Sequence, residues 1–178
     1  VRQGKIRYIG CSNYPAWRLV EALWTSRHYR LARYDSLQPH YNLIHRQEFE
    51  SELAQVCRLY GLGVIPYSPL AGGFLTGKYR KGASLPDSSR AEDMQGNFTE
   101  RNWAILDTLE TIGREKGGYS VSQVALAWLL SDPVITSPII GPRSIEQLQD
   151  NLGAAGLRLT AEEKTLLDKA SAWISDSE

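Results

Sequence analysis

Short apolar runs alternate with longer amphipathic stretches along the chain, and this alternation constrains the fold more than any other feature. Four runs have the character of buried strands and lie at residues 6–11, 34–38, 63–67 and 134–140. Stretches with apolar residues at helical spacing follow them. Such alternation is typical of a parallel sheet covered by helices. The chain is therefore predicted to be an α/β protein with four strand–helix units.

Helical spacing and end signals predict the helices. The first begins at Pro15, and others lie at about 47–60, 100–116, 121–131, 144–152 and from Thr160 to near Trp173. Trp17 and Trp24 are expected on the apolar face of the first helix. Ser120 and Thr160 each begin a capping-box pattern, and Gly61 is expected to end the second helix.

The composition is that of an ordinary globular protein. The 178 residues are 42% hydrophobic and 22% charged, which argues against wholesale disorder and against a coiled coil. A chain of this length buries one sizeable core, so a single domain is predicted over residues 1–178. A long loop at about 70–98 is rich in Gly, Ser and Asp, and is expected to be functional or partly disordered.

Charge and residue types exclude several partners and sites. The 20 basic and 20 acidic residues cancel, so no nucleic acid or membrane partner is expected. No apolar run approaches the ~18 residues of a membrane span, and the N-terminus does not have the pattern of a signal peptide. Cys11 and Cys57 cannot form a disulfide framework, so a cytoplasmic setting is expected. The three histidines lack metal-ligand spacing, so no metal site is expected.

Polar side chains stand where the first two predicted strands end. Ser12 and Asn13 could present a hydroxyl and an amide to a ligand, or could instead cap the following helix. A nucleophile elbow is disfavoured because Tyr14 replaces the second glycine of Gly-x-Ser-x-Gly. Gln38 could point its amide into a site or be a polar turn residue. His40 has no placed acidic partner in the sequence, which disfavours a general base.

A glycine-rich loop follows the third predicted strand. Residues 72–78 fit the Gly-x₄-Gly-Lys spacing of nucleotide-triphosphate loops, but Tyr79 replaces the Ser or Thr that must reach magnesium. The loop therefore favours phosphate binding of another kind, through backbone N–H groups and Lys78. A flexible glycine loop without a ligand stays an alternative.

A fourth polar segment follows the last predicted strand. Gly141 permits close backbone approach, Arg143 can fork onto a phosphate, and Ser144 caps a helix whose N-terminus favours an anion. The side chains of Gln147, Asp150 and Asn151 share one helical face. The alternative is a capped surface helix with solvated polar residues.

In these segments the sequence resembles the aldo-keto reductases, in the branch of bacterial general reductases and potassium-channel β subunits. The matching elements are GKIRYIGCSN, QPHYNL, GLGVIPYSPLAGGFLTGKY, QVALAWLL and PIIGPRSIEQLQDNLGA. The resemblance implies a (β/α)₈ barrel that binds NADP(H) in extended form without a Rossmann domain. The matched segments correspond to strands five to eight, so the chain is expected to form half of a TIM-type barrel with a C-terminal helix.

The resemblance also implies three groups of cofactor-binding residues. The nicotinamide carboxamide would be held by Ser12, Asn13 and Gln38, and the nicotinamide ring would stack on Tyr67. The pyrophosphate would be lined by Ser68, Pro69, Leu70, Ala71, Gly72 and Gly73, with Lys78 nearby. The adenosine and its 2′-phosphate would be enclosed by Gly141, Arg143, Gln147, Asp150 and Asn151, with Arg90 at the adenosine end.

The implied function is reversible hydride transfer between NADP(H) and an aldehyde or ketone. The family's catalytic Asp, Tyr, Lys and His belong to strands that this chain does not match, so no catalytic residue is assigned and the isolated chain is expected to be inactive. An isolated half barrel is expected to associate with a complementary half, to pair with itself or to be poorly soluble. Two other hypotheses remain: a dinucleotide-binding or regulatory module without turnover, and a phosphate-binding fragment unrelated to nicotinamide.

Overall fold

The structure, a computed structural model, describes residues 1–84 and 94–173. Its strands are β1 (Ile9–Ser12), β2 (Tyr34–Gln38) and β3 (Gly63–Val64). Its α-helices are α1 (Ala16–His28), α2 (Ala54–Tyr60), α3 (Glu100–Glu115), α4 (Val121–Leu130), α5 (Ile145–Gly153) and α6 (Ala161–Ala170). A π-helical turn, η1 (Phe49–Leu53), leads into α2, and the 3₁₀ segments are η2 (Ala71–Thr76), η3 (Gln95–Asn97) and η4 (Ala154–Gly156).

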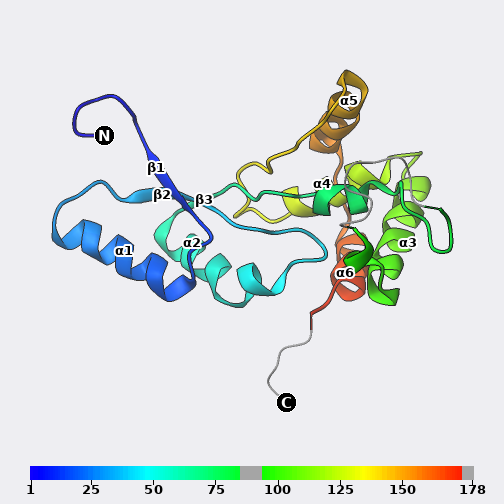
Figure 1. Cartoon of the computed structure of the whole chain (residues 1–178), viewed down its shortest axis with the longest axis horizontal. Coiled ribbons are helices and arrows are strands. Elements are labelled where there is room, and N and C mark those ends of the chain that lie inside the picture. Colours follow the sequence, from blue (N-terminus) through cyan, green and yellow to red (C-terminus); the bar gives the residue numbers. More distant parts are fainter. Residues whose placement is uncertain (85–93, 174–178) are drawn as a thin grey trace, which may run out of the picture.

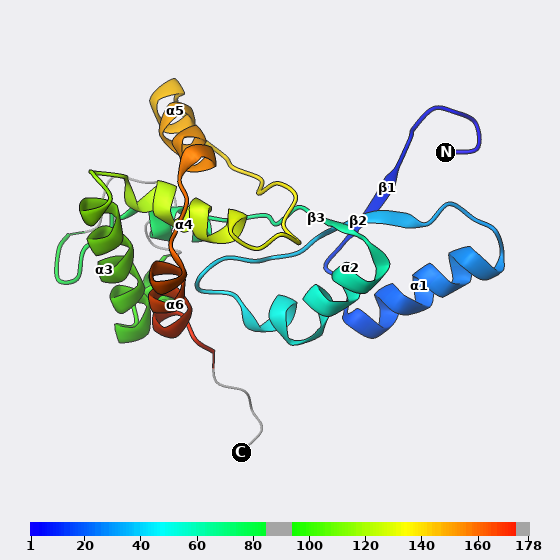
Figure 2. The ribbon, with the colours of Figure 1, turned by 180° about the vertical axis from the view of Figure 1, so that it is seen from behind.

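The molecule is elongated, with the sheet, α1 and α2 at one end and α3 to α6 at the other (Figure 1). The strands are parallel in the order β1–β2–β3, with Ser12 opposite Gln38 and Leu37 opposite Val64. Both α1 and α2 lie on the same side of the sheet (Figures 1 and 2). Leu37 and Val64 are buried, whereas Gly10 and Ser12 are exposed. The sheet is therefore covered on one face and open on the other.

The prediction of a fourth regular strand at residues 134–140 was wrong. This segment runs beside β3 but forms a single parallel bridge, between Ile135 and Val64. The amides of Thr136 and Ile139 donate to the carbonyls of Val64 and Pro66, both at 2.8 Å. Proline has no N–H group, so Pro66 cannot donate a return hydrogen bond. The third predicted strand, at 63–67, ends early at Val64. The amides of Ile65 and Tyr67 still donate to the carbonyls of Leu37 and Pro39, but Pro39 has no N–H group to donate in return.

Most helix ends follow the local signals. Ser120 and Thr160 form complete capping boxes at the starts of α4 and α6, as predicted. Gly61 ends α2 in the left-handed conformation, with φ of 60°. The predicted helix at 47–60 is present as η1 followed by α2. Local side-chain and glycine chemistry therefore sets these boundaries.

The two tryptophans of α1 are not on its buried face, which corrects the expectation for this helix. Trp17 is 66% exposed and Trp24 is 55% exposed. A narrower stripe that includes Leu19 and Leu23 packs against the core instead. Trp24 lies across the surface, where its indole N–H donates to the hydroxyl of Tyr60 at 3.0 Å.

One apolar core links the elements at both ends of the molecule. The segment after β2 is tied to the C-terminal helices through Arg46, whose guanidinium donates to both carboxylate oxygens of Glu50, at 2.8 and 3.0 Å, and to the Ser171 hydroxyl at 2.7 Å. Such charge-assisted bonds are stronger when partly buried than at the surface. Among helices formed by the described residues, none has the length and apolar character needed to cross a membrane.

Candidate dinucleotide site

A large pocket of about 670 Å³ opens between the loop after β3 and the segment that leads into α5. Its lining residues are Tyr67, Ser68, Pro69, Leu70, Gly72, Gly73, Thr76, Lys78, Ser122, Ile139, Ile140, Gly141, Pro142, Arg143, Gln147, Asp150 and Asn151. Its volume lies within the range of small-molecule and cofactor sites.

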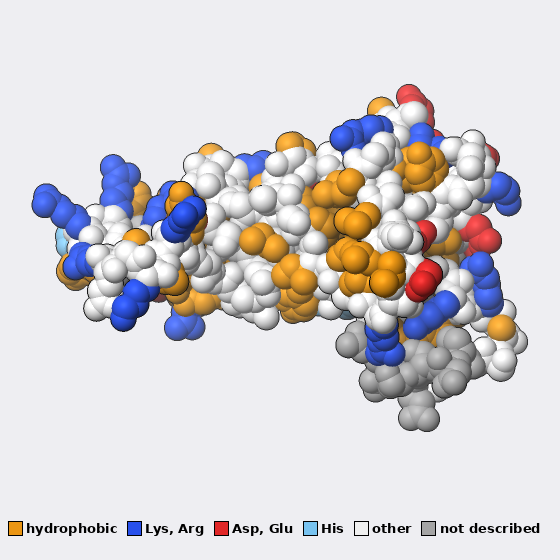
Figure 3. Space-filling view, turned by 90° about the horizontal axis from the view of Figure 1, so that it is seen from above, with side chains coloured by type: hydrophobic (Ala, Val, Ile, Leu, Met, Phe, Trp, Pro, Cys, Tyr) orange, Lys and Arg blue, Asp and Glu red, His pale blue; other side chains and the backbone are white. Residues whose placement is uncertain are grey.

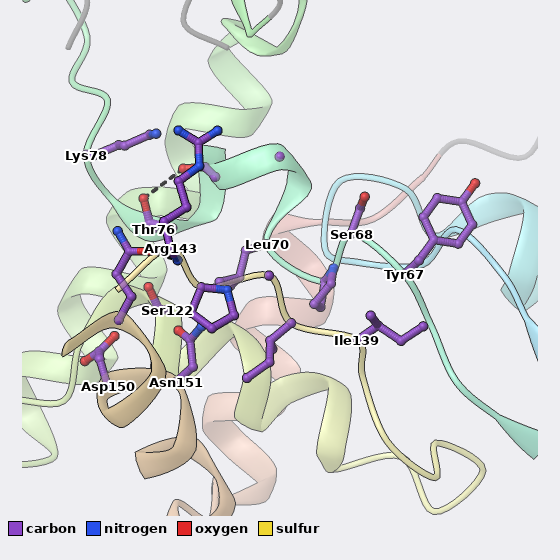
Figure 4. Close-up of a pocket in the computed structure, with 17 residues that line it drawn as sticks. Tyr67, Ser68, Leu70, Thr76, Lys78, Ser122, Ile139, Arg143, Asp150 and Asn151 are labelled. Atoms are coloured by element: carbon purple, nitrogen blue, oxygen red, sulfur yellow. Dashed lines mark hydrogen bonds between the residues drawn. The ribbon is translucent and has the colours of Figure 1, made fainter. Parts of the chain in front are cut away.

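The polar and aromatic groups of the pocket are separated along its length. Lys78 and Arg143 lie toward one end, near Thr76, while Tyr67 lies at the other end beyond Ser68 (Figure 4). Ser122 and Asn151 lie below the basic end in the same view. The arrangement can accept an elongated ligand that carries anionic groups at one end and a flat ring at the other.

The loop between the two ends depends on left-handed backbone. Ser68, Ala71, Gly72 and Gly73 all have positive φ, and Gly73 has φ of 103°. A Cβ atom at Gly73 would lie 3.3 Å from the ammonium nitrogen of Lys78. The backbone conformation therefore favours glycine here, whereas the flexible end of Lys78 could give way to an added methyl group.

An aromatic cluster packs against the glycine loop and holds it in place. Phe74 of η2 packs against Tyr79 and Trp103, with ring centroids 6.0 and 5.3 Å apart, and Phe98 contacts all three rings. Phe74 and Tyr79 are almost fully buried. The cluster fixes the two ends of the segment that presents Thr76 and Lys78 to the pocket.

The far wall of the pocket is built at the N-terminus of α5. The Ser144 hydroxyl accepts a hydrogen bond from the backbone N–H of Gln147, which confirms the predicted cap. The Gln147 side-chain oxygen in turn accepts from the Arg143 amide at 2.8 Å. Asp150 accepts from the Ser120 hydroxyl at 3.0 Å, which joins α5 to the start of α4. These hydrogen bonds therefore hold the turn that carries Arg143 and the start of α5 in place.

Ser12, Asn13 and Gln38 do not line the large pocket but lie together at the tips of β1 and β2. The Ser12 hydroxyl donates to the Gln38 carbonyl at 2.8 Å. Neither Ser12 nor Asn13 caps α1. The N-cap position is Pro15, and no side chain accepts a hydrogen bond from the first backbone N–H groups of the helix. The alternative role of these residues as a helix cap was therefore wrong.

The strand tips continue directly into the aromatic end of the pocket. Tyr67 forms an isolated parallel bridge with His40, and its amide donates to the Pro39 carbonyl at 3.0 Å. The rings of His40 and Tyr67 are stacked, with centroids 5.0 Å apart and planes 9° apart. Gln38 is therefore only two positions along the chain from His40, whose ring stacks on Tyr67.

The pocket thus gathers most of the expected residues from the glycine loop and from the 141–151 segment. Ala71 is buried behind the loop surface and is not among the lining residues, and Arg90 lies outside the described part of the chain. Five further lining residues were not predicted from the sequence: Thr76, Ser122, Ile139, Ile140 and Pro142. The position of Thr76 within the glycine loop was a usable signal, whereas Ser122 belongs to an apolar helix that gave none. Within residues 1–84 and 94–173, no cluster of His, Cys, Asp and Glu could hold a metal ion.

Curated relatives match this chain over most of its length. It is 38% identical over 162 residues to an uncharacterized oxidoreductase, YrpG, of Bacillus subtilis. The matched region covers 91% of this chain and 48% of the relative. It is 36% identical to an L-glyceraldehyde 3-phosphate reductase of Escherichia coli K12, with 86% of this chain and 46% of the relative covered. It is 34% identical to a putative voltage-gated potassium channel subunit beta of Schizosaccharomyces pombe, with the same shares covered.

These matches extend over about half the length of the relatives. The model of the aldo/keto reductase family matches residues 1–172, almost the whole chain. The family match includes the strand tips, the glycine loop and the α5 segment that surround the pocket. The chain therefore belongs to the aldo/keto reductase family.

Proposed function

We propose that this chain is the NADP(H)-binding half of an aldo-keto reductase that transfers a hydride reversibly between the dinucleotide and an aldehyde or ketone. One observation carries the proposal: a single pocket has basic side chains at one end and a partly exposed aromatic ring, Tyr67, at the other. Family membership supports the same assignment. The dinucleotide, when bound, supplies the hydride, and the chain binds and orients it.

The residues present fit such a cofactor at its phosphate end. Arg143 and Lys78 offer positive charge, and the hydroxyls of Thr76 and Ser122 lie in the same part of the pocket (Figure 4). The left-handed glycine loop lets the backbone approach a pyrophosphate where a Cβ would intrude. We assign Arg143 to the 2′-phosphate because a guanidinium can bind a phosphate through two hydrogen bonds.

At the other end, the nicotinamide ring would lie against Tyr67. Ser12, Asn13 and Gln38 would then hold its carboxamide from the tips of β1 and β2. The Gln38 amide can both donate and accept, which suits a carboxamide ligand. Fixing the carboxamide decides which face of the ring points toward the substrate, and this orientation is the contribution of the chain to hydride transfer.

We also propose that four further strand–helix units complete the barrel and supply the proton donor. The strands β1, β2 and β3 and the extended segment at 134–140 would be the last four of eight positions. The open face of the sheet and the relatives' greater length support this arrangement. A cytoplasmic setting agrees with the two free thiols, Cys11 and Cys57.

The test of the phosphate assignment compares two dinucleotides and two arginine variants. Arg143→Ala is expected to weaken NADPH binding about ten- to hundredfold while leaving NADH binding little changed, because a charge-assisted phosphate contact is lost. Arg158→Ala, an exposed residue outside the pocket lining, is the control and should change neither. Fluorescence titration of the bound dinucleotide measures both. Equal losses for NADPH and NADH would refute the assignment, and saturable binding of neither nucleotide by the unmodified chain would refute the proposed function.

A further inference from the structure

Three aromatic rings form a column behind the aromatic end of the pocket. His45 packs on His40 with centroids 4.2 Å apart and planes tilted by 33°, and His40 stacks on Tyr67 with centroids 5.0 Å apart and planes 9° apart. His40 is thus the middle ring. Tyr67 ends the column and lines the pocket.

The chain holds this column in place through a buried asparagine. Asn42 has no exposed surface, and its side-chain oxygen accepts from the amides of Ile44 and His45 at 2.9 and 3.1 Å. Its side-chain nitrogen donates to the carbonyl of Ser68, the residue after Tyr67, at 2.9 Å. The loop that carries both histidines is therefore fastened to the segment that carries Tyr67. A satisfied buried amide of this kind fixes one local geometry.

We propose that His40, supported by His45, is a positioning residue that holds Tyr67 as the stacking platform for the nicotinamide ring, and that protonation of the two histidines weakens this platform. The inference rests on the proposed function. A neutral imidazole offers Tyr67 a flat π-face. An imidazolium places positive charge two rings away from an oxidised nicotinamide, which is itself a cation, and opposes its binding.

The surroundings of the two rings set the direction of this effect. Desolvation lowers the pKa of His40, while the nearby Glu48 raises it to a smaller extent. Desolvation of the stacked ring also lowers the pKa of His45, with further lowering from His40 and Arg101 and an opposing contribution from Glu48. Both rings are therefore neutral at pH 7.5, and they take up protons below the ordinary histidine value of 6.5. The platform is expected to be intact above that pH and to weaken as the pH falls.

The experiment measures the affinity of the full chain for NADP⁺ and for 2′-phospho-ADP-ribose, which lacks only the nicotinamide ring, at pH 7.5 and at a lower pH at which NMR of the imidazole protons shows both rings to be charged. Phosphate protonation affects both ligands alike, so their affinity ratio isolates the contribution of the ring. In the unmodified chain this ratio is expected to fall about two- to tenfold at the lower pH, in keeping with the energy of one aromatic pair. A ratio that does not change with pH would overturn the proposal.

Variants separate the positioning of Tyr67 by the His40 ring from the effect of histidine protonation. The double variant His40→Phe with His45→Phe keeps the rings and loses the protons, so its ratio should stay high at both pH values. His40→Ala removes the middle ring and should lower the ratio at both. His28→Phe, which changes the exposed third histidine of the chain on α1, should behave like the unmodified chain.

Two outcomes would count against different claims. A high, pH-independent ratio in a folded His40→Ala variant would overturn the role of the column while leaving the proposed function standing. Binding of neither ligand by the unmodified chain would overturn the proposed function, and the inference with it. If His40→Ala fails to fold, as judged by its thermal transition, the phenylalanine variants and the pH dependence of the unmodified chain still decide the question.

Discussion

Two buried tyrosines place their hydroxyl groups in opposite environments. The hydroxyl of Tyr79 has no hydrogen-bond partner among the described residues, and its ring belongs to the aromatic cluster below the glycine loop. The hydroxyl of Tyr41 donates to a carboxylate oxygen of Glu50 at 2.7 Å. Burial and the negative charge of Glu50 raise the pKa of Tyr41, so it stays a neutral donor. An unpaired buried hydroxyl costs stability, whereas one bonded to a carboxylate contributes it.

Removing each hydroxyl should therefore change stability in opposite directions. Tyr79→Phe is expected to raise the free energy of unfolding by about 1 kcal/mol, because an unsatisfied polar group is deleted. Tyr41→Phe is expected to lower it by about 1.5–3 kcal/mol, because a charge-assisted bond is lost and Glu50 loses a donor. Urea denaturation of both variants measures the difference. A destabilised Tyr79→Phe variant would show that the hydroxyl has a stabilising partner.

At the residue scale, the sequence could predict the part of the site that follows strands. Lys78 and Arg143 were expected because glycine and cation chemistry directly after an apolar run is typical of a phosphate-binding loop, whereas Tyr67 was expected from the family resemblance. Ser122 and Ile139 were missed because their neighbours have the periodicity of core elements. They reach the pocket only through the packing of α4 and the path of the extended segment, which no local pattern encodes.

At the element scale, the glycine loop depends on how η2 meets α4. Gly77 ends η2 with φ of 76°, and a Cβ there would lie 3.0 Å from a methyl group of Val121, the first residue of α4. Gly82 has the same φ of 76°, but no atom of the described residues lies within 4 Å of a Cβ added there. The two glycines thus share one backbone conformation and differ in packing.

This pair separates backbone strain from steric contact. Gly82→Ala is expected to cost only the strain of placing alanine at positive φ. Gly77→Ala is expected to cost about 1–3 kcal/mol more, because the added methyl group must displace Val121 in a packed interface. It should also weaken NADPH binding, since Thr76 and Lys78 flank the substituted position. Equal losses of stability in urea denaturation would mean that the contact relaxes without cost.

Helix ends were predictable because their signals are local, whereas strand pairing was not. The hydroxyls of Ser120 and Thr160 bond within three residues of their own positions, so the sequence alone specifies them. The segment at 134–140 has strand character, but its pairing depends on a partner that is two residues long and is followed by Pro66. Trp17 and Trp24 have helical spacing, but their exposure depends on what else covers α1.

At the scale of the whole molecule, apolar side chains are exposed on α1 and α5, two helices that lie far apart. Trp17 and Trp24 of α1 are exposed at one end, and Ile145, Leu148 and Leu152 of α5 are 70%, 38% and 58% exposed at the other (Figure 1). The three α5 residues lie three and four positions apart and therefore share one face. Hydrophobic side chains also gather over the end that carries α4 and α5 (Figure 3). Exposed apolar faces of this kind mark interaction surfaces.

We propose that one occupant, a set of four further strand–helix units, covers both faces, because the first and last helices of a half barrel both adjoin the other half when the barrel closes. The N-terminal half of the Bacillus subtilis relative, which is 38% identical to this chain in the matched region, is a practical source of those units. Mixing is expected to give a one-to-one complex in sedimentation velocity. Leu152→Ser should weaken it by about tenfold or more, because about 1.5–3 kcal/mol of side-chain burial is lost.

The matched control is Leu166→Ser on α6, a leucine that is 54% exposed against 58% for Leu152 but lies outside both apolar faces. It should leave the association unchanged, since the proposed closure buries α1 and α5. Without the added half, the chain should self-associate as its concentration rises, because the apolar faces are then covered by other copies. A monodisperse monomer that unfolds cooperatively and does not bind the added half would contradict the half-barrel arrangement. Binding of NADPH by that monomer would still support the dinucleotide site.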